Sequence, residues 1–577
     1  MTTIEGLREQ YRTGNTTPAR VIEEIYGRIR SEGERPVWIS LANEKAALER
    51  AAAVDITLPL GGIPFAVKDN FDAAGMTTTA GCPSFAYEPG RSASVVQRLT
   101  DAGAILIGKT NMDQFATGLV GVRSPYGACS SVYDSRYISG GSSSGSAVAV
   151  AKNLCAFSLG TDTAGSGRVP AAFNNLIGLK PTRGLLSTQG VVPACRSLDC
   201  VSIFSRTARD AETVWSIAKD FDADDPYSRT APPGAGAAPW LNATFRFGVP
   251  EESQLKFFGD DEAPLLYRKA IEKLGGLGGK AVTIDFSVFR EAAELLYSGP
   301  WVAERFAAVG EFLQMHSEGV NETVKNIILG ATKYSAADAY KSAYRLETLK
   351  LQAAAQWAGM DVLVLPTAGT IYRKEAVLAD PVRLNSNLGF YTNFVNLMDL
   401  AAVAVPAGFR RDGLPFGISL IGPAFSDEAL LRLSSRYMAE RSEKKTAPGC
   451  VLVAVAGAHL SGQPLNYQLT ERGARLVRTC RTTSEYRLYA LQTTPPKPGL
   501  VRETGFYGVG IEVEVWAVPE NTFGSFVDAI PAPLGIGAVT LEDGSVVKGF
   551  ICEQAGLSSA QEITQFGGWR NYLADRG

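Results

Sequence analysis

Histidine is scarce in this sequence of 577 residues, which contains only His316 and His459. The eight cysteines are scattered along the chain, form no Cys-x-x-Cys pair, and neither histidine lies near a cysteine cluster. This distribution excludes the usual spacings of a zinc site and of a disulfide framework. It is typical of a cytoplasmic protein with free thiols, and we expect no metal ion and no cofactor.

Long apolar runs are missing as well. No stretch reaches the ~20 residues that a membrane helix needs, and the N-terminal segment does not resemble a secretory signal, so we expect no membrane association. The net charge of −3, without a sustained Lys/Arg run, argues against a nucleic-acid partner. With 45% apolar and 20% charged residues, the composition is that of a globular protein, and the length predicts at least two domains.

The order of apolar and polar segments predicts an α/β fold. Between residues 60 and 210, apolar runs alternate with Gly/Ser-rich turns, so that 63–67 and 104–107 are expected strands and 93–102 is an expected helix. Such alternation is typical of a sheet with helices on both faces. Other expected elements are helices within 1–31, 146–153, 260–360 and 426–441 and a buried strand at 361–366.

A polar stretch with proline and glycine at 442–449 marks the main domain boundary. After it the sequence becomes β-rich: residues 510–516 alternate apolar and polar side chains, and Asp543–Gly544 is typical of a hairpin turn. We therefore predict a large α/β domain at 1–445 and a smaller, β-rich α+β domain at 450–577.

Two segments match well-known sequence motifs but lack the structural context that the function of each motif requires. Residues 103–110 fit the P-loop pattern GxxxxGK[ST], but the intervening residues are apolar and belong to the expected strand, whereas a P-loop wraps phosphates with free backbone amides. Residues 141–145 fit the GxSxG nucleophile elbow, but the strand before them is weak and only two histidines could complete a triad. Neither an ATP site nor an α/β-hydrolase triad is therefore expected.

Three other segments carry a more consistent chemistry. Lys68 ends an apolar strand, where burial disfavours the ammonium and can lower the pKa by about 3–5, which would make the amine a neutral base. Ser142 lies in the Gly/Ser-rich run 139–146. Ser166 lies in 160–170, whose small residues leave backbone amides free to bind an oxyanion, at about 3–4 kcal/mol per donor.

These segments resemble the amidase signature family, whose pattern is a lysine, a Gly/Ser-rich loop and a GTDxxGS segment. The resemblance covers about residues 20–440 and implies that Lys68 is the base, Ser142 a relay serine after a cis peptide bond, and Ser166 the nucleophile. It implies a mixed sheet, flanked by helices, instead of a parallel one. It also implies an oxyanion hole formed by Thr163, Ala164 and Gly165.

The segment around a Gly-Pro pair at 299–300 bears on the substrate. The pair ends one helix and begins another, so that Arg305 falls in the second turn and could give two hydrogen bonds to a carboxylate, with Tyr297 adding a third. The residues alone favour a different interpretation, in which Arg305 lies on a solvated helix face and pairs with Glu304 or Glu311.

A second resemblance favours the carboxylate-binding interpretation of Arg305. Residues 296–305, 391–400 and 455–466 are similar to segments of allophanate hydrolases. The resemblance implies that Tyr297 and Arg305 hold the carboxylate of allophanate (urea-1-carboxylate) while the nucleophile attacks its terminal amide.

The second domain resembles the gamma-glutamylcyclotransferase-like fold. In allophanate hydrolases this domain is implied to decarboxylate the N-carboxycarbamate that the first domain releases. His459, which can be protonated near pH 7, is the candidate proton donor, and a structural histidine bonded to backbone fits almost as well. Asn466, Tyr486 and Lys497 are weaker candidates for the same site.

The resemblances together predict an allophanate hydrolase that works as a cytoplasmic homodimer, with a link to a urea carboxylase or to biuret- and cyanurate-degrading enzymes. Two alternatives stay open. The chain could be an amidase-signature hydrolase of another small amide, and its C-terminal domain could serve only for binding or dimerisation.

Overall fold

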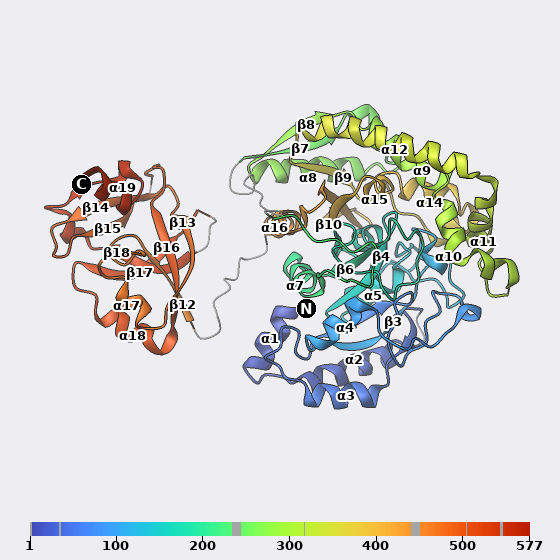
Figure 1. Cartoon of the computed structure of the whole chain (residues 1–577), viewed down its shortest axis with the longest axis horizontal. Helices are drawn as coiled ribbons and strands as arrows, with labels where there is room; N and C mark the ends of the chain where they lie inside the picture. The colour runs from blue at the N-terminus through green and yellow to red at the C-terminus, as the bar shows by residue number, and fades with distance from the viewer. Residues whose placement is uncertain are drawn as a thin grey trace. The chain divides into compact units, whose positions relative to one another are not determined.

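The computed structural model describes residues 3–33, 36–233, 244–316, 318–439, 450–503, 505–542 and 546–576. The chain divides into two compact units, Met1–Glu440 and Arg441–Gly577 (Figure 1). The stretch 442–449 and the turn expected at Asp543–Gly544 lie outside the described residues.

The described part of the first unit contains an 11-stranded sheet. The strands lie in the order β1 (Trp38–Leu41), β3 (Ile105–Thr110), β2 (Pro64–Lys68), β4 (Phe157–Asp162), β6 (Cys200–Ser205), β5 (Ile177–Lys180), β10 (Leu400–Phe409), β11 (Pro415–Pro423), β9 (Val362–Pro366), β7 (Phe245–Pro250) and β8 (Gly279–Ile284). β2 pairs in parallel with β3 and β4, and β7 with β8 and β9, whereas the other neighbours are antiparallel. The predicted α/β class with a mixed sheet is confirmed.

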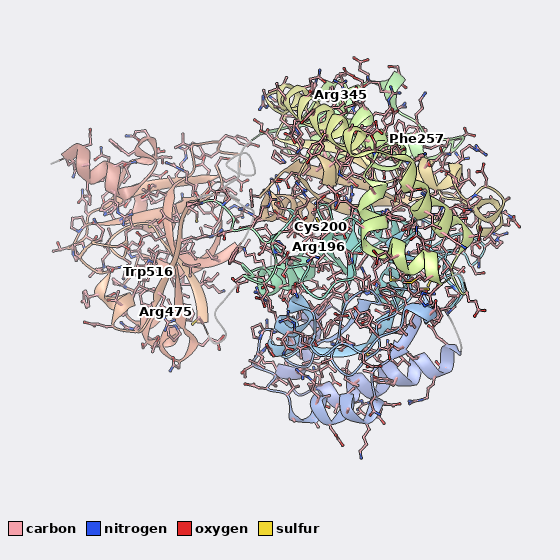
Figure 2. All side chains as sticks on the ribbon, turned by 45° about the vertical axis from the view of Figure 1, so that its right-hand side comes forward. Arg196, Cys200, Phe257, Arg345, Arg475 and Trp516 are labelled. Carbon is pink, nitrogen blue, oxygen red and sulfur yellow. The ribbon has the colours of Figure 1, made fainter. Side chains whose placement is uncertain are left out.

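Helices pack on both faces of this sheet (Figure 1). The helices of this unit are α1 (Ile4–Arg12), α2 (Pro18–Glu32), α3 (Glu44–Ala53), α4 (Ser94–Asp101), α5 (Ser144–Ala151), α6 (Val169–Phe173), α7 (Ala208–Ala218), α8 (Ala263–Gly276), α9 (Ser287–Ser298), α10 (Val302–Met315), α11 (Glu322–Leu329), α12 (Ala336–Trp357), α13 (Lys374–Ala379), α14 (Arg383–Leu388), α15 (Phe394–Leu397) and α16 (Asp427–Tyr437). α10 and α11 pack in a separate apolar cluster, away from the sheet. Arg345 of α12 lies at the outer edge of this unit and pairs with Glu291 of α9 (Figure 2). Within the described residues, no helix has both the length and the apolar character needed to cross a membrane.

The alternation of side chains along β2 decides where Lys68 lies. Phe65 and Val67 belong to the core on one face of the sheet, and Ala66 belongs to the core that includes α5 on the other face. Because successive side chains of a strand point to opposite faces, Lys68 lies on the same face as Ala66. The strand therefore presents Lys68 on the side of the segment that leads into α5.

The prediction of a continuous helical stretch at 260–360 is wrong in one part. The strand β8 interrupts it between α8 and α9 and forms an edge of the sheet beside β7. Most of its side chains are exposed or half-buried. An edge strand of this kind needs no continuous apolar run, which is why the sequence pattern did not reveal it.

The second unit is β-rich. Its described residues form a five-stranded sheet, in the order β13 (Arg475–Arg481), β16 (Glu512–Pro519), β12 (Cys450–Val455), β18 (Val546–Cys552) and β17 (Leu534–Thr540), and a three-stranded sheet, in the order β15 (Lys497–Arg502), β14 (Tyr486–Leu491) and β19 (Gln561–Glu562). The helices are α17 (Tyr467–Thr470), α18 (Glu520–Asp528) and α19 (Trp569–Arg576). β17 and β18 pair as an antiparallel hairpin, so the predicted β-rich α+β class is confirmed.

Candidate active site

Lys68 ends β2 with a fully buried side chain. Its Nζ lies 2.7 Å from Ser142 Oγ and 2.7 Å from Thr161 Oγ1. Burial lowers the pKa of Lys68 to about 7, against the opposing effect of three aspartates. An amine with this pKa is neutral in a large fraction of molecules near pH 7 and can accept a proton.

Ser142 connects Lys68 to Ser166. The two serine Oγ atoms lie 2.9 Å apart, and all three side chains are at most 3% exposed. Ser142 precedes α5 and follows a cis peptide bond from Gly141. The structure thus brings together three side chains that are distant in the sequence, in one hydrogen-bonded chain along which a proton can pass.

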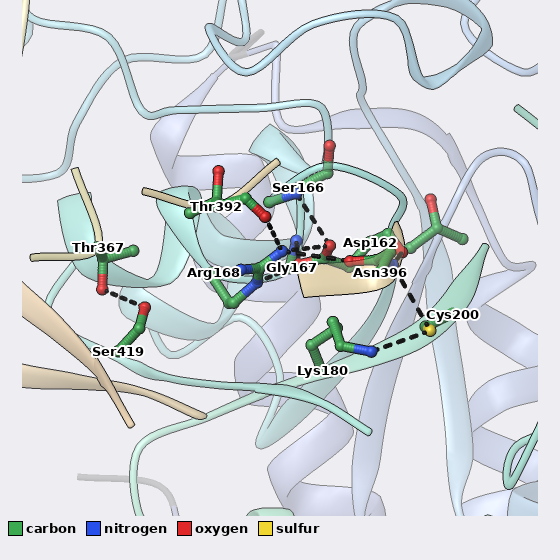
Figure 3. Close-up of polar contacts among 12 residues, drawn as sticks. Asp162, Ser166, Gly167, Arg168, Lys180, Cys200, Thr367, Thr392, Asn396 and Ser419 are labelled. Atoms are coloured by element: carbon green, nitrogen blue, oxygen red, sulfur yellow. Dashed lines mark hydrogen bonds and ion pairs between the residues drawn. The ribbon is translucent and has the colours of Figure 1, made fainter. Parts of the chain in front are cut away.

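Asp162 holds the two amides that flank Ser166. Its Oδ1 accepts from the Gly165 N–H at 2.9 Å and its Oδ2 accepts from the Gly167 N–H at 3.0 Å. Both oxygens also accept from the Arg168 guanidinium at 2.9 Å, and both charged side chains are fully buried (Figure 3). Burial opposes ionisation, but Arg168, together with Lys180 and the Gly167 N–H, holds the pKa of Asp162 below its ordinary value. The Ser166 hydroxyl points away from this ion pair (Figure 3).

Residues before and within α15 brace the same loop. Arg168 Nη2 donates to Thr392 O at 3.2 Å, and Asn396 Nδ2 donates to Asp162 O at 2.7 Å and to Leu198 O at 2.9 Å (Figure 3). The sequence analysis found residues 391–400 similar to a segment of allophanate hydrolases, but it did not reveal these contacts, which join residues 224 and 234 positions apart. The one available signal was a charged pair, Asp162 and Arg168, within a segment of small residues.

The backbone amides of the expected oxyanion hole differ in whether they already have a hydrogen-bond acceptor. The Gly165 N–H is donated to a carboxylate, whereas those of Thr163, Ala164 and Ser166 have no acceptor in the part of the chain that the structure describes. The Thr163 hydroxyl donates to Asp199, which fixes this side of the loop. Three amides therefore stay available to an oxyanion, and one of them, that of Ser166, was absent from the sequence prediction.

Arg305 is a buried cation without a carboxylate partner. It lies on α10, and its residue is 2% exposed. Its Nη1 donates to Thr117 Oγ1 at 2.9 Å and to Ala116 O at 3.3 Å, and its Nη2 donates to Tyr297 OH at 3.2 Å. Glu304 forms its hydrogen bonds elsewhere, and within the described ranges no carboxylate lies within 4.0 Å of the guanidinium. The interpretation of a solvated arginine paired with a neighbouring glutamate is therefore wrong. An unpaired buried charge is costly unless an anionic ligand joins it.

The second unit contains a cavity of about 190 Å³ around His459, Gln468 and Lys497, whose other lining residues have no polar side chain. His459 Nε2 lies 2.9 Å from Gln468 Oε1, and its ring stacks on Phe550 with centroids 4.8 Å apart. Burial and the charge of Lys497 lower the pKa of His459, although the hydrogen bond with Gln468 opposes them. The protonated imidazole expected from the sequence is thus disfavoured at neutral pH while the cavity holds no anion.

The weaker candidates for this cavity are placed differently. Lys497 lines it, and Asn466 Nδ2 donates to His459 O at 2.8 Å, which holds the backbone of the histidine. Tyr486 lies in the hydrophobic core, where its hydroxyl accepts from the Thr540 N–H at 2.9 Å, and it does not line the cavity. All eight cysteines are free, and no group of His, Cys, Asp or Glu among the described residues could hold a metal ion.

Comparison with known proteins follows the division into two units. The family model described as Amidase matches residues 20–431, and the model described as the allophanate hydrolase C-terminal domain matches residues 451–574. The chain belongs to the amidase family. This confirms the predicted membership, and the site around Lys68, Ser142 and Ser166 lies within the matched range.

Several relatives of this amidase-family chain cover much of its length. The urea amidolyase of Lachancea kluyveri is 44% identical over 97% of the chain, but the chain spans only 32% of that relative. A glutamyl-tRNA(Gln) amidotransferase subunit of Lachnospira eligens is 33% identical over 75% of the chain and 96% of its own length. The structure of the SeMet-substituted allophanate hydrolase of Kluyveromyces lactis is 43% identical, with a TM-score of 0.74 and coverage of 99% of both chains. The sequence and the fold are thus allophanate-hydrolase-like throughout.

Proposed function

We propose that the chain hydrolyses the terminal amide of allophanate. Neutral Lys68 takes a proton from Ser142, Ser142 takes one from Ser166, and the Ser166 oxygen attacks the amide carbonyl carbon. The proton then returns to the amide nitrogen, the C–N bond breaks and ammonia leaves. Water enters by the same relay and cleaves the acyl-enzyme, which releases N-carboxycarbamate.

The N–H groups of Thr163, Ala164 and Ser166 are proposed to bind the oxyanion of the tetrahedral intermediate. Support comes from their lack of an acceptor in the described part of the chain, and from the ion pair beneath the loop, which holds the donors before the reaction begins. Donors that need no rearrangement at the moment of reaction stabilise the developing charge more than mobile ones.

The observation that carries the choice of substrate is the unpaired, buried guanidinium of Arg305. Thr117 accepts from this guanidinium, and the carbonyl of the next residue, Gly118, lies 3.4 Å from Ser166 Oγ. A substrate held at Arg305 by a carboxylate would therefore place a nearby amide at Ser166. In allophanate one planar nitrogen separates the carboxylate from the amide carbonyl, so the two groups are close together, and Tyr297 would add a hydrogen bond to the carboxylate.

The names of the relatives support the same substrate. The Kluyveromyces lactis protein is named an allophanate hydrolase, and two yeast relatives are named urea amidolyases. Because allophanate is carboxylated urea, a urea carboxylase would supply it, and biuret- or cyanurate-degrading enzymes are the other proposed source. The homodimer and the cytoplasmic location stay predictions.

We propose a second step in the cavity of the second unit. N-carboxycarbamate would lose CO₂ as one C–N bond breaks, and the nitrogen would take a proton to give carbamate. Lys497 would attract this dianion. A bound dianion would raise the pKa of His459 again, so that the imidazole becomes protonated when the ligand is present and supplies the proton.

Ammonia release from allophanate tests the first step directly. The purified chain should hydrolyse allophanate with a kcat/KM far above that for acetamide, urea and biuret, which lack the carboxylate. Equal rates for the charged and neutral amides would instead identify an amidase-family hydrolase of another small amide.

A further inference from the structure

A strained turn lies between Arg305 and Ser166. Phe115 and Ala116 have φ angles of 48° and 51°, which side chains with a Cβ rarely adopt. Such backbone persists only where the surrounding structure holds it in place, and it is found preferentially at functional sites. The turn is followed by Thr117 and Gly118.

Two buried guanidinium groups hold Thr117. Arg305 Nη1 donates to its hydroxyl oxygen at 2.9 Å, and Arg123 Nη1 donates to its carbonyl oxygen at 3.0 Å. The Thr117 hydroxyl in turn donates to Phe115 O at 3.1 Å, within the strained turn. Arg305 thus contacts the backbone of this turn directly, at Ala116 O, and also indirectly, through the Thr117 hydroxyl.

The next carbonyl competes for the Ser166 proton. Ser166 Oγ accepts from the Ser142 hydroxyl at 2.9 Å, and the Ser166 hydroxyl donates to Gly118 O at 3.4 Å. Only a hydrogen bond donated in the opposite direction, from Ser166 to Ser142, passes the proton toward the base. A side chain at position 118 would stand 2.7 Å from Asp113 Oδ2, so the carbonyl reaches Ser166 only because this residue is glycine.

We propose that Thr117 is a positioning residue that couples an anion bound at Arg305 to the hydroxyl of Ser166. The inference rests on the proposed carboxylate site. A carboxylate takes up donors of the guanidinium and weakens its bond to Thr117. The turn then relaxes, Gly118 O withdraws, and the Ser166 hydroxyl donates to Ser142. The enzyme is therefore activated by its own substrate's charge.

The test compares the reactivity of Ser166 with and without acetate, using methanesulfonyl fluoride. In this reaction the Ser166 oxygen bonds to sulfur, the S–F bond breaks, fluoride leaves and the serine proton enters the Ser142–Lys68 chain. Acetate supplies the carboxylate without an amide. We expect acetate to accelerate inactivation saturably and about tenfold, the effect of roughly one hydrogen bond to a charged group.

Two substitutions at one position separate coupling from simple structural support. Thr117→Val keeps the shape and removes the hydroxyl, which leaves only the longer bond to Ala116 O, so most of the acetate effect should be lost, and kcat for allophanate should fall about tenfold with KM little changed. Thr117→Ser keeps the hydroxyl and should retain both. Thr182 is also buried and donates to Asp427 at 2.6 Å, so Thr182→Val controls for the loss of a buried hydroxyl and should retain the acetate effect.

Acetate that slows inactivation of the unaltered protein, or leaves it unchanged, overturns the coupling, and so does a full acetate effect in Thr117→Val. Allophanate turnover is measured in parallel. A chain that responds to acetate but does not hydrolyse allophanate would refute the proposed substrate and retain the coupling. A chain that hydrolyses allophanate without responding to acetate would refute the coupling alone.

Discussion

Lys68 Nζ and Ser142 Oγ lie 2.7 Å apart at the end of β2, where neither residue has any exposed surface. Thr161 Oγ1 lies at the same distance of 2.7 Å from the amine and can accept one of its N–H groups. A neutral amine held in this way directs its lone pair at the Ser142 hydroxyl. An ammonium in the same place has no lone pair and can only donate, so the protonation state of one buried nitrogen decides whether the relay can work.

The pH dependence of the amidase reaction should follow this nitrogen. In the proposed mechanism Lys68 is the base, so activity requires its unprotonated form, which is present above a pKa of about 7 and lost below it. We expect kcat/KM for ammonia release to fall on the acid side with an apparent pKa near this value. Lys68→Met should lower the rate by at least ~10²–10⁴-fold and remove this limb from the remaining activity. An acid limb that persists unchanged in Lys68→Met would assign the titration to another group.

Ser142 and Ser166 should behave as one unit with Lys68. Ser166→Ala should reduce kcat by about 10⁴–10⁶-fold, and adding Lys68→Met to it should cost little more, since the members of such a chain are non-additive. Ser142→Ala should lie between the unaltered protein and Ser166→Ala. Single-turnover ammonia release measures all of these variants. Losses that multiply in the double variant would mean that the side chains act independently.

Arg305 should determine the preference for an anionic amide. Arg305→Lys retains the charge but loses the paired geometry, and we expect kcat/KM for allophanate to fall by about 10²-fold while that for biuret changes little. Arg345→Lys is a matched control, because Arg345 is exposed and pairs with Glu291 at the edge of the unit. Equal losses on both substrates would contradict the carboxylate site.

The reactive side chains could be predicted because each lies in a locally recognisable segment. Lys68 ends an apolar strand, Ser142 and Ser166 lie in runs of small residues, and Arg305 follows a Gly-Pro pair. The geometry that supports them could not be predicted. Asn396 reaches Asp162 across 234 positions, and no periodicity or spacing encodes such a contact.

The electrostatic environment of the charged side chains was the second feature that the sequence could not predict. The sequence indicated that His459 can be protonated near neutral pH, but burial and the charge of Lys497 lower its pKa and favour the neutral form. The solvated interpretation of Arg305 failed for a related reason. α10 buries only one face, on which Arg305 lies in line with Val302 and Val309, and it exposes the opposite face, so the error was to place Arg305 on the wrong face of an amphipathic helix.

The ion pair of Asp162 and Arg168 should contribute strongly to stability. Both side chains are fully buried, so removing one charge leaves the other without a partner at a cost of about 3–5 kcal/mol. Asp162→Asn should therefore lower the free energy of unfolding in urea and strongly reduce activity, since asparagine keeps only one oxygen and one of the amides of Gly165 and Gly167 loses its acceptor. Asp380→Asn removes an exposed pair with Arg383 and should change stability little. A small, equal effect of both substitutions would show that the buried pair is dispensable.

The two histidines allow a paired test of the second unit. His459→Asn should leave the first release of ammonia from allophanate unchanged and slow the release of CO₂ by about tenfold or more, because the proton donor is lost where the dianion would bind. His316 stacks on Phe312 at 4.6 Å in the first unit and is exposed, so His316→Asn should alter neither product. Following ammonia and CO₂ together separates the two steps in one experiment. Identical CO₂ time courses for His459→Asn and the unaltered chain would remove the catalytic role of the cavity and favour a unit that serves only for binding.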